Sequence, residues 1–173
     1  LVTLINDIIR LSELDEGGQL PAEPVDLQDL ALETVRSLTE LAAGRNVTLT
    51  AVGTTAPMTG VRRLLAETVY NLCENAVKYN VPGGSVTVET GETAQDVTLT
   101  VRDTGIGIPA AEQSRVFERF YRVDKSHSRA IGGTGLGLSI VKHAVACHHG
   151  TVQLDSTPGQ GTVITVTLPK VAA

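Results

Sequence analysis

The residues best suited to chemistry form a polar row in the middle of the chain. Asn71, Asn75 and Lys78 recur at steps of three and four in an otherwise apolar segment, so a helix would place them on one side. An amide oxygen is a hard ligand for Mg²⁺, and a lysine ammonium can meet a phosphate as a point charge. On this row alone, an ordinary solvated helix face remains an open alternative.

A second segment begins with Asp103, at the end of a predicted strand, and continues through a glycine-rich turn over residues 104–109. Glycines let a backbone approach a ligand closely, and the aspartate can accept a hydrogen bond from the amino group of adenine. Ile106 and Ile108 can line a mainly apolar base pocket. A tight turn capped by the aspartate is the simpler alternative, because a short Gly-x-Gly pattern is weak evidence.

A third segment, residues 132–142, runs from glycines directly into a predicted helix. The free amides and the positive dipole of a helix start favour phosphate. The segment lacks the Gly-Lys-Ser/Thr ending of a Walker loop, and no buried strand immediately precedes it as in a Rossmann turn. The glycines therefore indicate either a phosphate site or a flexible hinge.

Aromatic and basic residues interleave between the second and third segments. Phe117, Phe120 and Tyr121 are separated or followed by four cations, namely Arg119, Arg122, Lys125 and Arg129. Aromatic anchors in a basic loop would form a lid over phosphates, although a charge run is more often a solvated loop. The 4 histidines lack convincing metal-ligand partners in the sequence.

Periodic apolar residues predict the elements that position these segments. We expect an apolar-striped helix over residues 1–16, a linker over residues 17–25, and a main domain over residues 26–173 in which Asp26 caps a helix. Further helices are expected over residues 61–79, from 109, and over 137–148, and strands over residues 47–52, 85–90, 97–102, 151–156 and 162–168. This order predicts an α+β fold, a two-layer α/β sandwich with helices covering a mixed sheet.

The composition limits the class of protein. The chain has 173 residues, 42% of them hydrophobic, which suits one ordinary core with a small appendage. A net charge of -5 argues against nucleic acid as a partner. Cys73 and Cys147 lie in apolar helical patterns, so we expect small buried residues in a reducing compartment rather than a disulfide. No apolar run reaches the roughly 18 residues of a membrane span, so we expect this stretch to be cytoplasmic.

Taken together and in this order, the segments resemble the asparagine, first glycine, phenylalanine and second glycine boxes of bacterial sensor histidine kinases. The resemblance covers residues 26–170, and residues 159–162 are similar to the last glycine turn of that family. It implies an ATP-binding catalytic domain with the sandwich fold that these kinases share with gyrase, the MutL repair proteins and Hsp90. One mild departure is residues 58–61, where the family often has an aspartate.

The resemblance also implies a role for each matching residue. Asn75 resembles the Mg²⁺ ligand, Asp103 the residue that reads adenine, and Glu74 a group that could orient or deprotonate the incoming imidazole. The residues implied to act in catalysis are Asn71, Glu74, Lys78 and Arg122. The residues implied to bind ATP are Asn71, Asn75, Lys78, Tyr79, Asp103, Gly105, Gly107, Ile108, Phe120, Gly133, Thr134, Gly135, Leu136, Gly137, Leu138 and Thr162.

The implied reaction is transfer of the γ-phosphoryl group to a histidine, followed by relay to an aspartate of a response regulator in a two-component system. Positioning and charge neutralisation do most of this work. Residues 1–16 resemble the end of the second helix of the family's dimerisation and phosphotransfer hairpin. The acceptor histidine is therefore expected in a missing part of a homodimeric parent, whose missing parts would also reach the cell membrane.

Two alternatives belong to other classes. A gyrase-, MutL- or Hsp90-like ATPase typically has a glutamate where this chain has Asn71, and an amide cannot activate water as a carboxylate can. A non-catalytic nucleotide-binding module is disfavoured because Asn75, Lys78 and Asp103 are all present.

We expect the purified chain to bind Mg·ATP without phosphorylating itself, because the first expected helix contains no histidine. Incubation with γ-labelled ATP, followed by base or acid treatment, checks this expectation. Label on the protein that resists base and is lost in acid would contradict it.

Overall fold

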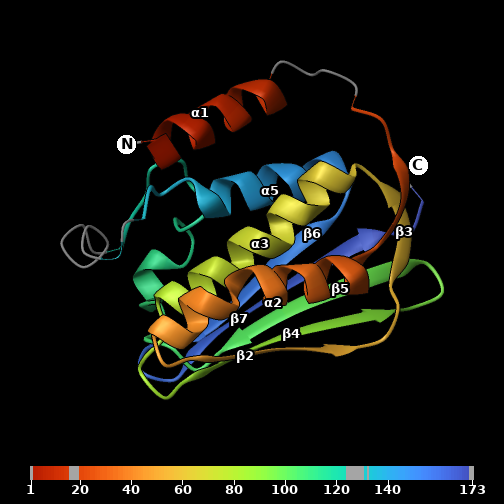
Figure 1. Ribbon diagram of the computed structural model, residues 1–173. Coiled ribbons are helices and arrows are strands. Elements are labelled where there is room, and N and C mark those ends of the chain that lie inside the picture. The colour runs from red at the N-terminus through yellow and green to blue at the C-terminus, as the bar shows by residue number, and fades with distance from the viewer. Residues whose placement is uncertain (1, 16–19, 124–130, 132, 172–173) are drawn as a thin grey trace.

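A sheet and a layer of helices on one of its faces make up the fold (Figure 1). The computed structural model describes residues 2–15, 20–123, 131 and 133–171. The elements are α1 (Val2–Asp15), β1 (Glu23–Asp26), α2 (Leu27–Gly44), β2 (Thr48–Gly53), β3 (Pro57–Gly60), α3 (Arg62–Lys78), β4 (Ser85–Glu92), β5 (Asp96–Asp103), η1 (Ala110–Glu112), α5 (Gly137–Cys147), β6 (Thr151–Thr157) and β7 (Gly161–Pro169). The predicted two-layer α+β fold is confirmed.

The main sheet is mixed and has the strand order β2-β4-β5-β7-β6. β2 runs parallel to β4, and the other neighbours are antiparallel. Alternate residues point to the helices, and Val86 and Val88 of β4 are fully buried there. The register of β5 and β7 places Asp103 opposite Thr162, so two predicted site residues meet at one end of the sheet.

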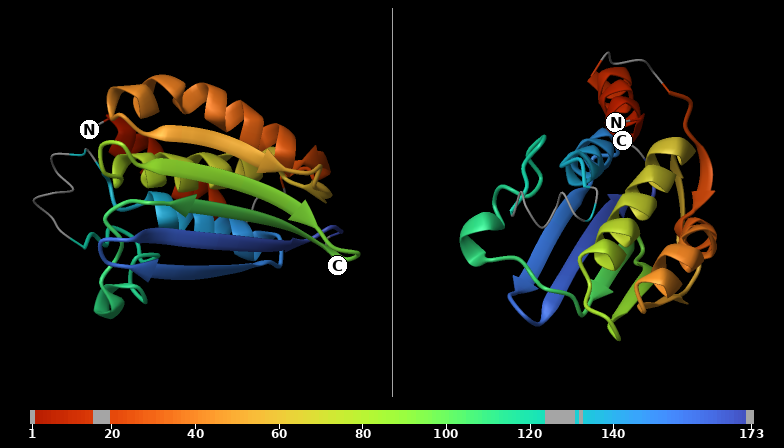
Figure 2. Two further views of the ribbon diagram at one scale, coloured as in Figure 1. Left: turned by 90° about the horizontal axis from the view of Figure 1, so that it is seen from below. Right: turned by 60° about the vertical axis from the view of Figure 1, so that its left-hand side comes forward.

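The helices α2, α3 and α5 lie side by side over the inner face of the sheet, with α3 in the middle (Figure 2). The buried side of α3 carries Leu65, Val69, Leu72 and Val77, each at most 2% exposed. Burying one such side chain contributes about 1.5–3 kcal/mol, so this apolar stripe holds the helix against the sheet. Its opposite side is free to present the predicted polar row. Asp26 caps α2 as predicted, because its Oδ1 accepts from Gln28 N–H at 2.9 Å.

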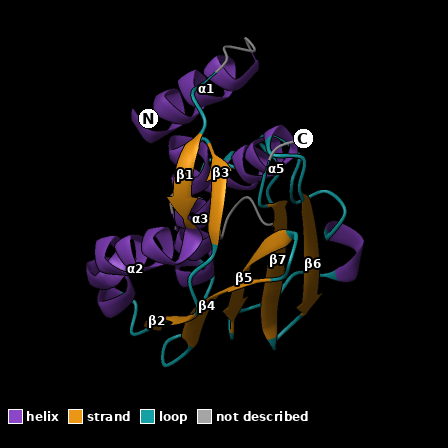
Figure 3. Ribbon diagram, turned by 90° about the vertical axis from the view of Figure 1, so that its right-hand side faces the viewer, coloured by secondary structure: helices purple, strands orange, loops and turns teal. Residues whose placement is uncertain are grey.

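A small second sheet joins β1 to β3 beside the helices (Figure 3). The sequence analysis placed residues 17–25 in a linker, but residues 23–25 belong to β1, with buried Val25 opposite Met58. Strands of 4 residues are too short to show a period-two pattern, so they were missed. Residues 16–19 lie outside the described part of the chain, and the proposed domain boundary stays a prediction.

The two cysteines differ in their surroundings. Cys73 is fully buried as expected, and burial raises the pKa of its thiol to about 12. Cys147 is exposed, so the expectation of a second buried cysteine is wrong. It occupies the last position of α5. Neither cysteine forms a disulfide.

The start of α3 is held by a histidine from α5. Val61 occupies the N-cap position without a side-chain bond, and its backbone N–H donates to Nε2 of His148 at 3.0 Å. Nδ1 of the same ring lies 2.7 Å from the carbonyl oxygen of Ala144, to which it donates while Nε2 accepts. A Cβ at Gly60 would lie 2.9 Å from the ring, so only glycine leaves this space. Residues 58–61, where the family often has an aspartate, thus receive their cap from a residue that is distant in the sequence.

We predict that His148→Leu lowers the free energy of unfolding by about 1–3 kcal/mol, because the Val61 N–H then loses its acceptor in a partly buried position. Urea unfolding followed by circular dichroism measures the change. His143→Leu, at a half-buried position of the same helix, is the control. Equal midpoints for the two variants would show that the cap contributes nothing.

Candidate functional site

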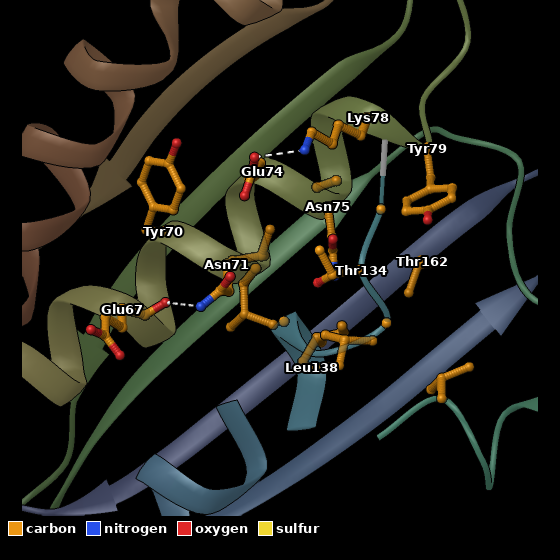
Figure 4. A pocket seen from close by; sticks show the side chains of 18 of the residues that line it. Glu67, Tyr70, Asn71, Glu74, Asn75, Lys78, Tyr79, Thr134, Leu138 and Thr162 are labelled. Atoms are coloured by element: carbon orange, nitrogen blue, oxygen red, sulfur yellow. Dashed lines mark hydrogen bonds and ion pairs between the residues drawn. The ribbon is translucent and has the colours of Figure 1, made fainter. Parts of the chain in front are cut away.

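A cavity of about 710 Å³ lies between α3, the start of α5 and the inner face of β5 and β7 (Figure 4). This volume is typical of a small-molecule site. Most of the sequence-predicted residues line it, namely Asn71, Glu74, Asn75, Lys78, Tyr79, Asp103, Gly107, Ile108, Arg122, Gly133, Thr134, Gly135, Gly137, Leu138 and Thr162. Gly105, Phe120 and Leu136 are absent from the lining. The fold therefore brings together segments that are far apart in the sequence.

The polar row of α3 faces the first turn of α5. A Cβ on Gly137 would lie 3.2 Å from Oδ1 of Asn71 and 3.8 Å from Nδ2 of Asn75. Lys78 Nζ pairs with Oε1 of Glu74 at 2.7 Å, one turn earlier on the same helix. Two amides and an ammonium thus lie opposite the free N–H groups of a helix start, an arrangement that suits an anion and its counter-ion.

Asp103 lies at the sheet end of the cavity. Its Oδ1 accepts from Gly105 N–H at 2.9 Å and from Thr162 N–H at 3.1 Å. Burial raises the pKa of the Asp103 carboxyl, and these two hydrogen bonds partly offset the rise. Both bonds use one oxygen, so Oδ2 keeps its capacity to accept a hydrogen bond from a ligand. Gly105 acts here through its amide, although it does not line the cavity.

A polar network that the sequence analysis missed supports the glycine turn. Ser156 Oγ accepts from Ile108 N–H at 2.8 Å and lies 2.8 Å from Oγ1 of Thr162. Gln113 donates to the carbonyl oxygens of Ile108 and Ser156, both at 2.9 Å. Ser156 is paired with Thr162 across the hairpin of β6 and β7. The glycine turn at residues 159–162, after the first of the two predicted strands, was the sequence signal for this hairpin.

The segment before α5 is fixed by backbone contacts with the aromatic stretch. Phe120 N–H donates to the carbonyl oxygen of Gly135 at 2.9 Å. Gly135 has a φ of 77°, and a Cβ there would lie 2.8 Å from the backbone of Phe120, so the close approach requires glycine. The Phe120 side chain is 56% exposed. Phe120 therefore contacts residues 133–136, the proposed phosphate loop, through its backbone, while its ring is largely exposed.

Arg122 is the cation that reaches the cavity from the stretch after β5. Its Nε and Nη2 atoms are buried and have no hydrogen-bond partner in the described part of the chain. Two buried nitrogen donors without acceptors are costly unless a ligand supplies the acceptors, and the fork geometry of a guanidinium matches phosphate. The predicted lid cations at residues 125 and 129 lie outside the described residues.

The first helix also contributes to the cavity, which the sequence analysis did not foresee. Thr3, Asn6, Asp7 and Arg10 of α1 line its far end. Arg10 Nε lies 3.6 Å from Oε1 of Glu67, a carboxylate one turn before the polar row. The apolar stripe of α1 was compatible with packing on a partner helix or on its own domain, and it did not indicate which polar residues would turn toward this cavity.

The described residues contain no group of three or more histidine, cysteine or acidic side chains that could hold a metal ion. Within the same residues, no helix combines the length and the apolar character of a membrane span. A cation that binds together with a phosphate ligand can take a single amide oxygen from the protein and further oxygens from the ligand.

Residues 60–172 match the family model described as "Histidine kinase-, DNA gyrase B-, and HSP90-like ATPase". The chain is 39% identical to the sensor-like histidine kinase SenX3 of Mycolicibacterium smegmatis, over 98% of this chain and 45% of that protein. It is 46% identical to the sensor histidine kinase WalK of Bacillus subtilis, over 61% of this chain and 18% of that protein. The chain thus spans less than half the length of these relatives.

Two solved structures are similar to the chain. The mycobacterial sensor histidine kinase MprB superimposes with a TM-score of 0.76 at 30% identity, covering 88% of this chain and all of that chain (100%). Full-length ShkA in complex with AMPPNP superimposes with a TM-score of 0.85 at 25% identity, covering 99% of this chain and 36% of that chain.

Proposed function

This chain belongs to the histidine kinase-, DNA gyrase B- and HSP90-like ATPase family as an ATP-binding catalytic domain of the sensor histidine kinase type, and on that premise we propose how its cavity uses Mg·ATP. The proposed reaction is transfer of the γ-phosphoryl group to a histidine of a dimerisation domain. The observation that carries the proposal is the convergence of Asp103, Asn75 and Arg122 on one cavity.

The adenine end of the proposed site lies at Asp103. Its Oδ2 can accept from the exocyclic amino group of adenine, a contact that guanine cannot make in the same pose. Ile108 supplies an apolar wall, and Tyr79 and Thr162 line the same end of the cavity (Figure 4). The network of Ser156 and Gln113 keeps this wall in place, so the base would enter a largely preformed pocket.

The phosphate end lies toward the start of α5. We propose that the N–H groups of residues 135–138 bind the β- and γ-phosphates, as expected of a helix start. Lys78 and Arg122 also line the cavity and would add positive charge, and Asn71 can donate to a phosphate oxygen. The unpartnered atoms of Arg122 support this placement, because phosphate oxygens would supply the acceptors that the described chain lacks.

Asn75 is the residue that fits a magnesium ion. Mg²⁺ usually keeps several waters and takes phosphate oxygens, so one amide oxygen at the cavity wall is sufficient from the protein. Bound Mg²⁺ would neutralise charge on the phosphates during transfer. The protein itself would position the reacting groups. Oε1 of Glu74 pairs with Lys78, and the other oxygen of this carboxylate stays available to an incoming imidazole.

Water activation is disfavoured in this site. Asn71, at the position where the related ATPases have glutamate, donates through Nδ2 to the carbonyl oxygen of Glu67 at 2.9 Å. The Glu67 carboxylate lies 3.4 Å from Arg63 and 3.6 Å from Arg10, so two guanidiniums hold it as an ion pair. We therefore favour transfer to a histidine over hydrolysis by a gyrase-like ATPase.

For the whole protein, we propose a homodimer in which this domain serves a phosphotransfer domain, a response regulator as the final acceptor, and a cell-membrane sensor as the parent. The relatives named as sensor histidine kinases support this proposal. In SenX3 the matched region covers only 45% of the protein.

We predict that the chain binds a non-hydrolysable ATP analogue more tightly with Mg²⁺ than without it. Asn75→Ala should remove most of the Mg²⁺ effect, and Asp103→Ala should remove the preference for adenine over guanine nucleotides, each by about tenfold as for one well-placed polar contact. Calorimetric titration measures both. The control is Asp155→Ala, an exposed aspartate on β6. A well-folded wild-type chain that binds no nucleotide would overturn the proposal.

We also predict that adenosine binding weakens on acidification at a higher pH than an ordinary aspartate would cause, because the pKa of Asp103 is raised by burial. Oδ1 already accepts two backbone hydrogen bonds, so a proton on the carboxyl would sit on Oδ2 and weaken its contact with the adenine amino group. Affinity is therefore full above this pKa and falls, by up to about tenfold per pH unit, below it. Adenosine carries no phosphate that titrates in this range. In Asp103→Asn the affinity should be low and independent of pH, and a wild-type profile flat down to pH 4 would contradict the assignment.

A further inference from the structure

The helix α1 is docked on the proposed phosphate loop. Leu11 of α1 is 5% exposed and packs with Leu136 and Ile140, both completely buried, with Leu4 alongside. Figures 1 and 2 show α1 lying over the start of α5. The residues that end the loop and begin α5 are therefore covered by a helix that the sequence analysis assigned to a different domain.

A carboxylate of α1 reaches the loop itself. Thr134 Oγ1 donates to Oδ2 of Asp7 at 2.8 Å, and the Leu136 N–H lies 3.4 Å from the same hydroxyl. The side chain of Asp7 is only 13% exposed, and it lines the cavity. A phosphate oxygen bonded to a loop amide would be linked to this carboxylate through three successive polar contacts, and so would lie at most about 9 Å from it.

The position of Asp7 along the cavity corresponds to the end of a nucleotide. Asp103 and Tyr79 mark the base end of the cavity. The glycine turn after Asp103 is joined to the end of α3 there, because the Ile106 N–H donates to the carbonyl oxygen of Tyr79. From there the polar row runs back along α3 toward Glu67 (Figure 4). Arg10 pairs with both Glu67 and Asp7, which places Asp7 near that far end of the cavity. A triphosphate would bring its terminal group closest to Asp7, and a diphosphate would stop short of it.

The negative charge of Asp7 is only weakly balanced. Arg10 Nη1 lies 3.9 Å from Asp7 Oδ1, and the same side chain is shared with Glu67 at 3.6 Å. Arg63 also lies 3.4 Å from Glu67 but pairs with Glu13 at 2.7 Å, so two guanidiniums face three carboxylates around the far end of the cavity. An anionic terminal phosphate would meet net repulsion there, and partial burial keeps such repulsion from being fully screened.

We propose that Asp7 is a specificity-determining residue that makes the docked site discriminate against the terminal phosphate of ATP relative to ADP. The inference rests on the proposed nucleotide site and adds a direction of coupling to it. Triphosphate binding and docking of α1 oppose each other, and by linkage each weakens the other by the same factor. ADP leaves α1 docked.

The test compares the affinities of ADP and a non-hydrolysable ATP analogue in the intact chain. Asp7→Asn removes the charge but keeps an acceptor for the Thr134 hydroxyl. It should strengthen triphosphate binding about tenfold, within the usual range of coupling between sites, and change ADP binding by less than about twofold. The matched control is Glu13→Gln on the same helix, whose carboxylate pairs with Arg63 at 2.7 Å, and both residues lie outside the cavity lining.

Hydrogen exchange gives an independent readout of docking. With the triphosphate, amide protection in α1 should fall in the wild type and stay unchanged in Asp7→Asn, and ADP should leave protection unchanged in both. An unaltered ratio of triphosphate to ADP affinity in Asp7→Asn, with ADP still bound, overturns this inference alone. Absence of any nucleotide binding in both proteins overturns the proposed function and this inference with it.

Discussion

The structure depends on one helix, α3, which must be apolar on the side that faces the sheet and polar on the side that faces the cavity. α3 buries Leu65, Val69 and Leu72 against the sheet, and this packing leaves Asn71 and Asn75 facing the cavity one turn apart. Because the buried side fixes the rotation of the helix, the polar row cannot turn away without exposing the core. Every other part of the site, including Asp103 on β5 and the start of α5, is arranged around that orientation.

Periodic patterns predicted the elements that have one buried face. The long helices and the strands of the main sheet were predicted within a few residues, and so was the Asp26 cap. The pattern failed where position depends on distant partners. β1 and β3 stabilise each other across the chain, and Cys147 is exposed although its local sequence is apolar. The cap on α3 comes from His148, far along the sequence, which no local rule could indicate.

The candidate site was predicted in its residues more than in its contacts. Ordered motifs identified the lining, because glycine turns, amides and charges serve recognisable chemistry. Phe120 acts through its backbone and Gly105 through its amide, which residue type alone does not reveal. Ser156 and the polar side of α1 were missed because their importance arises only after strands pair and a helix docks. Packing between segments creates these contacts, and a sequence pattern does not contain packing.

The small cluster of Leu11, Leu136 and Ile140 packs the first helix against the start of α5. A change of volume in the first helix alters the fit of the helix that begins at the phosphate loop, since closely packed interiors do not absorb an added or missing methylene freely. The two segments must therefore match each other in volume. A first helix taken from a relative would bring a different apolar surface to the loop, and Leu136 and Ile140 would then have to repack.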